Sequence, residues 1–356
     1  MIERDNFHFS WRPINGYNKP FNFVMSPREP GKTSMMWLEQ IYLPFKKDHR
    51  PWIYFVRQSV EITDALINSI FDTIIRKFTD DVFQVEYKSG SFKDGIVDVF
   101  IRYPEKESLL FFRIVSLSIQ LRRIKLAVLK NIKGVFMDEY IIDPRTDEKY
   151  QPNEAFKIKE AYTTWRRECD GILKMFFAAN PYSLYNPLFL DWRVNTAKLK
   201  KGEFYVGDTF VIQWATLTKE LRAHLLEVNP LYQFDEDYNQ YALEGTAIND
   251  AHINIDSLKP NFYLQFSFRF ENKYIGIWKN SIITDDLKYH VTFLNSISAK
   301  RTTYVIDFED MIERTQLIGV DERSKLSHFK NAFRRNLVYF NSIELYYILI
   351  EIYKNI

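Results

Sequence analysis

The sequence has few of the residues that would support a covalent or metal-based scaffold. Its 356 residues include a single cysteine, Cys169, which excludes an internal disulfide and a zinc site built on cysteine. The six histidines are scattered without the spacing of metal ligands. No apolar run approaches the length of a membrane span, and the first residues do not resemble a signal peptide. We therefore expect a cytoplasmic protein without a membrane anchor.

An excess of one charge is also missing. The chain has 48 Lys and Arg against 46 Asp and Glu, a formal net charge of +2, so any contact with nucleic acid must come from local basic clusters. In contrast, 46% of the residues are hydrophobic and 17% are aromatic, which is typical of a well-packed globular protein. The length suits two domains better than one core.

The most informative stretch is residues 21–33, where an apolar strand leads through a loop into a helix-compatible segment. Residues 26–33, SPREPGKT, fit the phosphate-binding pattern G-x-x-x-x-G-K-[ST], except that Ser26 replaces the first glycine. Such a loop binds the phosphates of ATP through backbone amides and the lysine, and its threonine hydroxyl binds Mg²⁺. The loop prolines remove two N–H donors and predict a stiff loop, and a chance GKT after a strand is the alternative. The predicted nucleotide-binding residues are Ser26, Arg28, Glu29, Gly31, Lys32, Thr33 and Ser34, with Thr33 also a metal ligand.

A second motif lies about 100 residues further on, where the apolar strand at residues 135–137 ends in two carboxylates. Asp138 would bind Mg²⁺, and Glu139 would orient and deprotonate the attacking water. Buried strands that end in two acids are costly unless a cation or proton compensates them. A solvent-facing acidic turn is the alternative interpretation.

A second buried strand is expected from Trp52 to Arg57, followed by a helix over residues 60–78. Because alternating strands and helices form parallel sheets, we predict an α/β fold with a mainly parallel sheet. Arg57 ends its strand, where it is either a surface residue or a contact to a nucleotide or partner. Three short strands would add a hairpin to this sheet, near residues 83–87, 97–103 and 109–114.

Further positions carry side chains suited to phosphoryl transfer. Lys125 lies in a basic segment that is either a solvated face or a contact to DNA or to a neighbouring subunit's nucleotide. Arg166 and Arg167 end the helix after Glu139, where they either complement the helix dipole or enter an adjacent protomer's site as an arginine finger. Asn180 ends the next strand, and we predict a contact to the γ-phosphate or the attacking water rather than a simple turn.

The pattern changes after residue 197. A basic segment at residues 198–202 and a short amphipathic helix at residues 217–228 predict a linker subdomain over residues 198–256. Strands followed by helices then predict an α+β domain over residues 257–356. Its expected strands are residues 262–270, 274–278 and 303–306, and its expected helices are residues 308–317, 325–336 and 342–353.

The last domain also has a candidate DNA contact. Basic side chains interleaved with Phe329 and Phe333 would contact phosphates without sequence preference, and a solvated helix face over an aromatic core is an equal alternative. These basic residues are Lys325, Lys330, Arg334 and Arg335. A two-metal nuclease needs clustered carboxylates, but the acids of this domain occur in helix-start or turn contexts and are interpreted as structural. They are Asp285, Asp286, Asp307, Glu309 and Asp310.

Several motifs together resemble the DNA-packaging (encapsidation) ATPase of phi-29-like tailed bacteriophages. The likeness covers most of the chain and includes an arginine, Arg28, at the third place of the phosphate loop. The other motifs are Phe21-Asn22-Phe23-Val24, Ile53-Tyr54-Phe55-Val56-Arg57, Asp138-Glu139-Tyr140, Pro152-Asn153-Glu154, Asn186-Pro187-Leu188-Phe189, Tyr274-Ile275-Gly276-Ile277-Trp278 and Thr284-Asp285-Asp286.

This resemblance implies a terminase-related, additional-strand P-loop ATPase domain over residues 1–197 and a ribonuclease H-like domain that has lost nuclease activity. It implies a pentameric ring that drives viral double-stranded DNA into a prohead at the portal vertex in the host cytoplasm, with a structural RNA as a further candidate partner. The family's trans-acting arginine falls on Arg166 or Arg167, and its trans-acting lysine falls near Lys125. Two alternatives stay open: a packaging protein with an active nuclease domain, and a P-loop phosphotransferase acting on a small molecule.

Overall fold

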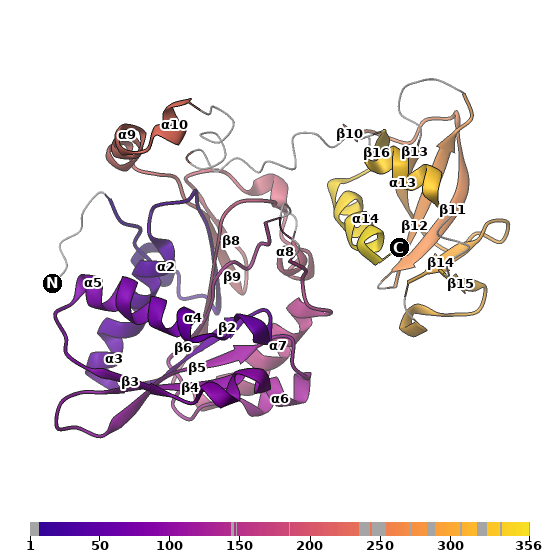
Figure 1. The fold of residues 1–356 in the computed structure, drawn as a ribbon. Helices are drawn as coiled ribbons and strands as arrows, with labels where there is room; N and C mark the ends of the chain where they lie inside the picture. Colours follow the sequence, from indigo (N-terminus) through magenta and orange to yellow (C-terminus); the bar gives the residue numbers. More distant parts are fainter. Residues whose placement is uncertain are drawn as a thin grey trace. The chain divides into compact units, whose positions relative to one another are not determined.

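The computed structural model describes most of the chain: residues 7–143, 146, 148–184, 186–234, 243, 254–270, 272–282, 289–306, 308–318, 326–334 and 337–355 (Figure 1). The chain divides into two compact units, Met1–Ala247 and Ile248–Ile356. Within the described residues, no helix is long and apolar enough to cross a membrane.

The first unit is built on a nine-stranded sheet in the order β3-β4-β5-β2-β6-β7-β1-β9-β8. The strands from β5 to β9 in this order run parallel to one another, and β3, β4 and β8 add antiparallel edges. Their bounds are β1 (Phe21–Met25), β2 (Trp52–Val56), β3 (Gln84–Tyr87), β4 (Ile96–Arg102), β5 (Ser108–Ser116), β6 (Gly134–Met137), β7 (Lys174–Ala179), β8 (Phe204–Val206) and β9 (Phe210–Trp214). The mainly parallel α/β fold predicted from the sequence is confirmed.

Helices cover both faces of this sheet, as the alternation of buried side chains along the strands requires. Phe23 and Phe55 point into one core with α6 and α7, whereas Val24 and Tyr54 point into the other with the segments after β1 and β2. The helix after β1 continues through π-helical turns at Met36–Tyr42. The helices are α1 (Arg12–Gly16), α2 (Lys32–Met35), α3 (Leu43–Asp48), α4 (Asp64–Asn68), α5 (Arg76–Phe78), α6 (Leu121–Leu126), α7 (Glu154–Trp165), α8 (Pro187–Asp191), α9 (Lys219–Val228) and α10 (Pro230–Phe234).

The segment expected to be a linker subdomain contributes to this first sheet. Strand β9 pairs in parallel with β1 over all five of its residues, and Ala215 donates its N–H to the Met25 carbonyl at 2.8 Å. The structure therefore places residues 204–214 in the first unit and moves the boundary well beyond residue 197. The expected amphipathic helix is present as α9.

The second unit has a seven-stranded sheet in the order β10-β16-β13-β12-β11-β14-β15. Strands β13, β12 and β11 form an antiparallel meander, and β14 and β15 continue the sheet from β11 as two parallel strands. The ribonuclease H-like fold implied by the resemblance stays a prediction. Both α13 (Ser327–Arg334) and α14 (Ile343–Asn355) pack into one core with this sheet. The strands are β10 (Asn254–Ile255), β11 (Phe262–Phe270), β12 (Lys273–Asn280), β13 (Tyr289–Leu294), β14 (Thr303–Val305), β15 (Thr315–Leu317) and β16 (Val338–Phe340).

One expected helix of this unit is wrong. Residues 308–317 form a single 3-10 turn, Phe308–Asp310, followed by β15. Arg314 between them has φ +71°, a left-handed conformation that an α-helix does not accommodate.

Candidate nucleotide site

Three neighbouring strands of the first sheet end at the same edge, and each delivers a predicted site residue there. The phosphate loop follows β1, Asp138 and Glu139 follow β6, and Asn180 follows β7, which lies between the other two. This insertion of one strand between the P-loop strand and the acidic strand is the additional-strand arrangement. The three strand ends surround a pocket of about 470 Å³ lined by Arg28, Glu29, Pro30, Gly31, Lys32, Thr33, Ser34, Asp138, Glu139, Ala179 and Asn180.

The loop conformation explains where glycine is needed and where it is not. Gly31 has φ +71° at the start of α2, and Glu29 is also left-handed at φ +78°. Ser26 has no positive φ, and its buried hydroxyl donates to the Pro27 carbonyl at 2.9 Å. The first position of the pattern therefore accepts a side chain here, whereas Gly31 occupies a conformation that favours glycine.

Lys32 is buried in the wall of the pocket. Its Nζ donates to Asn180 Oδ1 at 2.7 Å and to the Pro27 carbonyl at 3.4 Å. Burial lowers the Lys32 pKa to about 8, although the charges of Asp138 and Glu139 act in the opposite direction. A lysine held this way can meet an anion in the pocket with little loss of hydration.

The Thr33 hydroxyl and Asp138 converge on one point. Thr33 Oγ1 donates to Asp138 Oδ2 at 2.7 Å. Burial raises the pKa of Asp138, while the Thr33 hydrogen bond and the charge of Lys32 oppose that shift. A hydroxyl and a carboxylate are the oxygen ligands that Mg²⁺ accepts, so the donor set fits this ion.

Glu139 differs from Asp138 in its exposure and its backbone. Its side chain is exposed at the pocket, and its φ is +51°, which is uncommon for a residue with a side chain. Its N–H donates to Asp138 Oδ1 at 3.0 Å. Although the residue is exposed, the pocket walls partly desolvate its carboxylate, which raises the Glu139 pKa, and the neighbouring charge of Asp138 raises it further. A raised pKa makes a carboxylate a better proton acceptor.

Sequence reasoning missed two tyrosines that organise the loop. The Tyr182 hydroxyl accepts from Arg28 Nη2 at 3.0 Å and from Asn180 Nδ2 at 3.1 Å. The Tyr232 hydroxyl, in α10, donates to Glu29 Oε1 at 3.1 Å. Tyr182 follows Asn180 by two residues and could have been weighed with it, but the Tyr232 contact spans 203 residues and leaves no local signal.

The candidate trans-acting residues lie away from the pocket of their own chain. Helix α7 runs back along the sheet, so Arg166 and Arg167 are exposed near the edge where the strands begin. Two residues after Arg167, Cys169 Sγ lies 3.9 Å from Arg50 Nη2, which also lies 3.0 Å from the Ile132 carbonyl just before β6. Lys125 Nζ pairs with Glu160 on α7 at 2.8 Å. None of the three candidates, Arg166, Arg167 and Lys125, lines the described pocket. A role in hydrolysis therefore requires a neighbouring protomer.

The candidate DNA contacts are only partly covered by the structure. Lys330 lies on α13, and the backbone of Arg334 ends that helix. Lys325, Arg335 and the side chain of Arg334 fall outside the described residues. Among the acids of this unit, Asp285, Asp286, Asp307 and the side chain of Glu309 are also outside them. Asp310 is described, and its Oδ1 lies 3.7 Å from Arg269 Nη1.

A family model now joins these observations. The model of the podovirus DNA encapsidation protein (Gp16) matches residues 5–356. The chain belongs to this family. The resemblance noted in the sequence is therefore confirmed, and this encapsidation protein acts in the packaging of viral DNA.

Solved structures agree with this assignment at the level of the fold. A chain of the bacteriophage phi-29 viral genome packaging motor assembly is similar over 98% of this chain and 99% of its own, with a TM-score of 0.62 and 19% identity. The phi-28 gp11 DNA packaging motor is similar over 96% of this chain and 95% of its own, with a TM-score of 0.56 and 15% identity. No curated protein sequence matches this encapsidation protein.

Proposed function

We propose that this encapsidation protein hydrolyses ATP in the pocket between β1, β6 and β7 and uses the energy to move double-stranded DNA into a prohead. The observation that carries the proposal is the convergence of Lys32, the bonded pair Thr33 and Asp138, and Glu139 around one pocket. These are the cation, the metal ligands and the base that phosphoryl transfer to water needs.

Each residue has a separate task in this proposal. Lys32 stabilises the charge of the β- and γ-phosphates, and Asn180 beside it orients the γ-phosphate or the attacking water. Glu139, whose carboxylate is exposed at the pocket, takes the proton of that water. Thr33 and Asp138 would hold Mg²⁺, which when bound offsets the negative charge of the phosphates.

The proposed assembly is a homo-oligomeric ring. The structural relatives are components of packaging motors, which supports a ring seated at the portal vertex of the prohead in the host cytoplasm. Arg166 or Arg167 then enters a neighbour's pocket, a pentamer is the expected ring size, and a structural RNA is a candidate partner. Basic residues of the second unit contact the DNA backbone: Lys325, Lys330, Arg334 and Arg335.

A Glu139→Gln variant tests the proposal. Wild-type turnover of ATP is expected to rise when double-stranded DNA and empty proheads are added. Glu139→Gln keeps the shape of the side chain but loses the base. It should therefore bind ATP normally and hydrolyse it at least about 10²-fold more slowly. Glu86→Gln, which removes an acid from β3 outside the described pocket, is the control and should keep normal turnover. Unchanged turnover in Glu139→Gln would remove the assigned role.

The Mg²⁺ ligands are tested with two substitutions of Thr33. Thr33→Ser keeps the hydroxyl that meets Asp138, whereas Thr33→Val keeps the shape and removes it. We expect Mg²⁺ to increase the affinity for ATP in the wild type and in Thr33→Ser. The factor of this increase should be at least about tenfold smaller in Thr33→Val. Equal Mg²⁺ dependence of the two variants in a titration with a fluorescent ATP analogue would contradict the assignment.

No observation favours the two alternatives. A two-metal nuclease needs a cluster of carboxylates, and the described residues contain no group of three His, Cys, Asp or Glu side chains placed to hold a metal. Plasmid nicking in the presence of Mn²⁺ would support the nuclease alternative. ATP turnover indifferent to DNA and proheads would support the phosphotransferase.

A further inference from the structure

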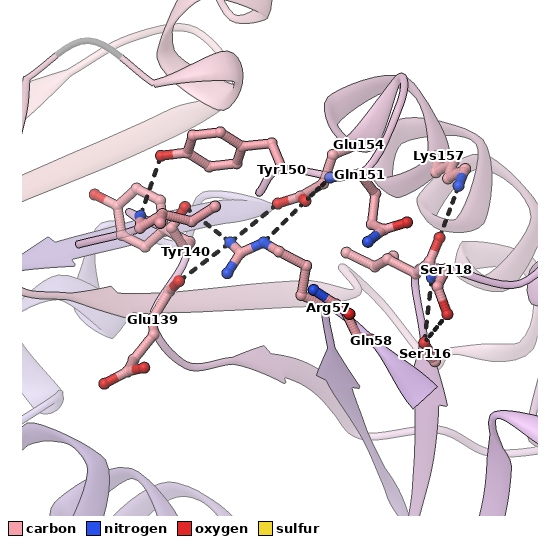
Figure 2. Close-up of polar contacts among 12 residues, drawn as sticks. Arg57, Gln58, Ser116, Ser118, Glu139, Tyr140, Tyr150, Gln151, Glu154 and Lys157 are labelled. Atoms are coloured by element: carbon pink, nitrogen blue, oxygen red, sulfur yellow. Dashed lines mark hydrogen bonds and ion pairs between the residues drawn. The ribbon is translucent and has the colours of Figure 1, made fainter. Parts of the chain in front are cut away.

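Arg57 ends strand β2, directly beside the strand that carries the two acids. Its side chain is only 5% exposed, so it is not a surface residue, and it does not line the described pocket. Its Nε lies 3.0 Å from Glu154 Oε2, and its Nη2 lies 3.2 Å from Glu154 Oε1 (Figure 2). Glu154 opens α7 and is 1% exposed, so both charges of this ion pair are buried and compensate each other.

The same guanidinium also holds the backbone after β6. Nη2 of Arg57 donates to the Glu139 carbonyl at 3.1 Å and to the Tyr140 carbonyl at 3.2 Å, and Figure 2 shows all these contacts radiating from one side chain. Strand β6 ends at Met137, so these carbonyls lie beyond its ladder. Buried carbonyls need a donor, and Arg57 supplies it.

This anchoring matters because Glu139 has a strained backbone. A residue with a side chain at φ +51° persists only where its surroundings hold it there. On the other side of the segment, Tyr140 donates its N–H to the Ala178 carbonyl at 3.2 Å. Arg57 and β7 therefore fix the peptide units around Glu139 from two directions.

The loop before α7 closes the network. Glu154 Oε2 also accepts the N–H of Gln151 at 2.9 Å, and Arg57 lies over the ring of Tyr150 with 5.2 Å between the guanidinium carbon and the ring centroid. The Tyr150 hydroxyl in turn accepts the N–H of Ile142 at 3.1 Å. Both ends of the connection between β6 and α7 are thus tied to Arg57.

We propose that Arg57 and Glu154 are positioning residues for hydrolysis: they hold the backbone of Glu139 so that its carboxylate faces the attacking water. Arg57 leaves the Glu139 side chain free for proton transfer, because it bonds the carbonyl of that residue and not its carboxylate. The inference rests on the proposed function, in which Glu139 is the base.

Arg57→Lys is the informative substitution. Lysine keeps the positive charge for Glu154 but lacks the fork that reaches the carboxylate and two carbonyls together. We expect kcat to fall about 10- to 100-fold with KM and ATP affinity changed less than about twofold, because misplacement of a reacting group slows the chemical step without touching the phosphate contacts.

Arg113→Lys is a matched control in the same sheet. Arg113 likewise forms a two-point pair with a carboxylate, Asp98, at 2.6 and 2.7 Å, and donates to the carbonyls of Ala127 and Val128 at 3.1 and 3.3 Å. It loses the same kinds of contact when shortened to lysine, but it touches no residue of the pocket. The kcat of the Arg113→Lys protein should stay within about twofold of wild type.

A second background separates positioning from general loss of structure. If Arg57 acts through Glu139, then Arg57→Lys should not lower kcat any further in a Glu139→Gln protein, because the base is already absent there. If Arg57→Lys lowers the residual turnover of Glu139→Gln by the same factor as it lowers wild-type turnover, the inference is overturned.

A double variant covers failure of Arg57→Lys to fold. Arg57→Met with Glu154→Leu removes both charges together, which avoids an unpaired buried charge and preserves packing. This variant should melt below the wild type, because the carbonyls of Glu139 and Tyr140 lose their donor, but it should fold, bind ATP and show the same fall in kcat. Wild-type kcat in either folded variant overturns the positioning role alone, whereas a wild-type chain that never hydrolyses ATP overturns the proposed function.

Discussion

Lys32 Nζ donates to Asn180 Oδ1 at 2.7 Å, so a side-chain hydrogen bond links the phosphate loop to the end of the strand inserted beside it. The bond offsets part of the cost of burying the lysine. It also places a neutral amide, and not a carboxylate, next to the expected position of the γ-phosphate. The choice of amide has a measurable consequence.

Asn180→Asp should weaken ATP binding. An added negative charge within a few ångströms of the phosphates opposes them by about 1–2 kcal/mol, which corresponds to about a 5- to 30-fold rise in Kd. Asn15→Asp is the control, because Asn15 Oδ1 also accepts from a lysine, Lys174, at 2.7 Å outside the pocket. Calorimetric titration with ATP at pH 7.5 checks both variants, and equal affinities would contradict the placement of Asn180.

The affinity for ATP should fall as the pH rises above about 8. Burial lowers the Lys32 pKa to about 8, so above that pH the lysine is neutral before ATP arrives and must take up a proton to pair with the phosphates. Below pH 8 the lysine is already charged and the affinity should be flat. Lys32→Met should bind weakly at every pH without an inflection near 8, and a wild-type profile flat to pH 10 would contradict the expectation.

Gly134→Ala should destabilise the first unit. A Cβ at this position would lie 2.6 Å from Cζ3 of the Trp52 ring, which is itself buried, so β6 or β2 must shift. Overpacking of this kind costs about 1–3 kcal/mol of unfolding free energy. A Cβ at Gly16 meets nothing within 4 Å, so Gly16→Ala should change stability by less than about 0.5 kcal/mol. Urea denaturation measures the unfolding free energy of both variants. Equal values for Gly134→Ala and Gly16→Ala would contradict this packing.

Mixed rings should identify the trans-acting arginine. A Lys32→Ala subunit lacks a working pocket but keeps its arginines, and an Arg166→Ala subunit keeps its pocket. If Arg166 is the finger, mixing these two inactive proteins should restore ATP turnover at the hybrid interfaces, because each supplies what the other lacks. The same mixture made with Arg167→Ala is the comparison. Restoration in neither mixture would remove both residues from this role.

The parts of the site that depend on local patterns could be predicted from the sequence. Gly31, Lys32 and Thr33 follow a strand with fixed spacing, and the acids at 138 and 139 end another strand. The carboxyl ends of parallel strands share one edge, so their approach to one another followed from the fold class. The insertion of β7 between those strands followed from the resemblance to the packaging ATPases.

The parts that depend on distant pairings could not be predicted. The Arg57 and Glu154 pair joins residues 97 positions apart, and nothing local distinguishes a buried arginine at a strand end from a ligand contact. The basic segment at residues 198–202 indicated a domain boundary, yet the apolar run of β9 beyond it completes the first sheet by pairing with β1. Such a pairing is set by tertiary packing and not by composition.

The phosphate loop is held from two remote parts of the chain. Phe9 donates its N–H to the Pro30 carbonyl at 2.7 Å, and Tyr232 bonds Glu29, so segments at both ends of the first unit brace a loop that already contains two prolines. Little conformational entropy is left for ATP to remove when it binds. Association should therefore proceed without a slow rearrangement of the loop, leaving the later steps of the cycle to set the pace of the motor.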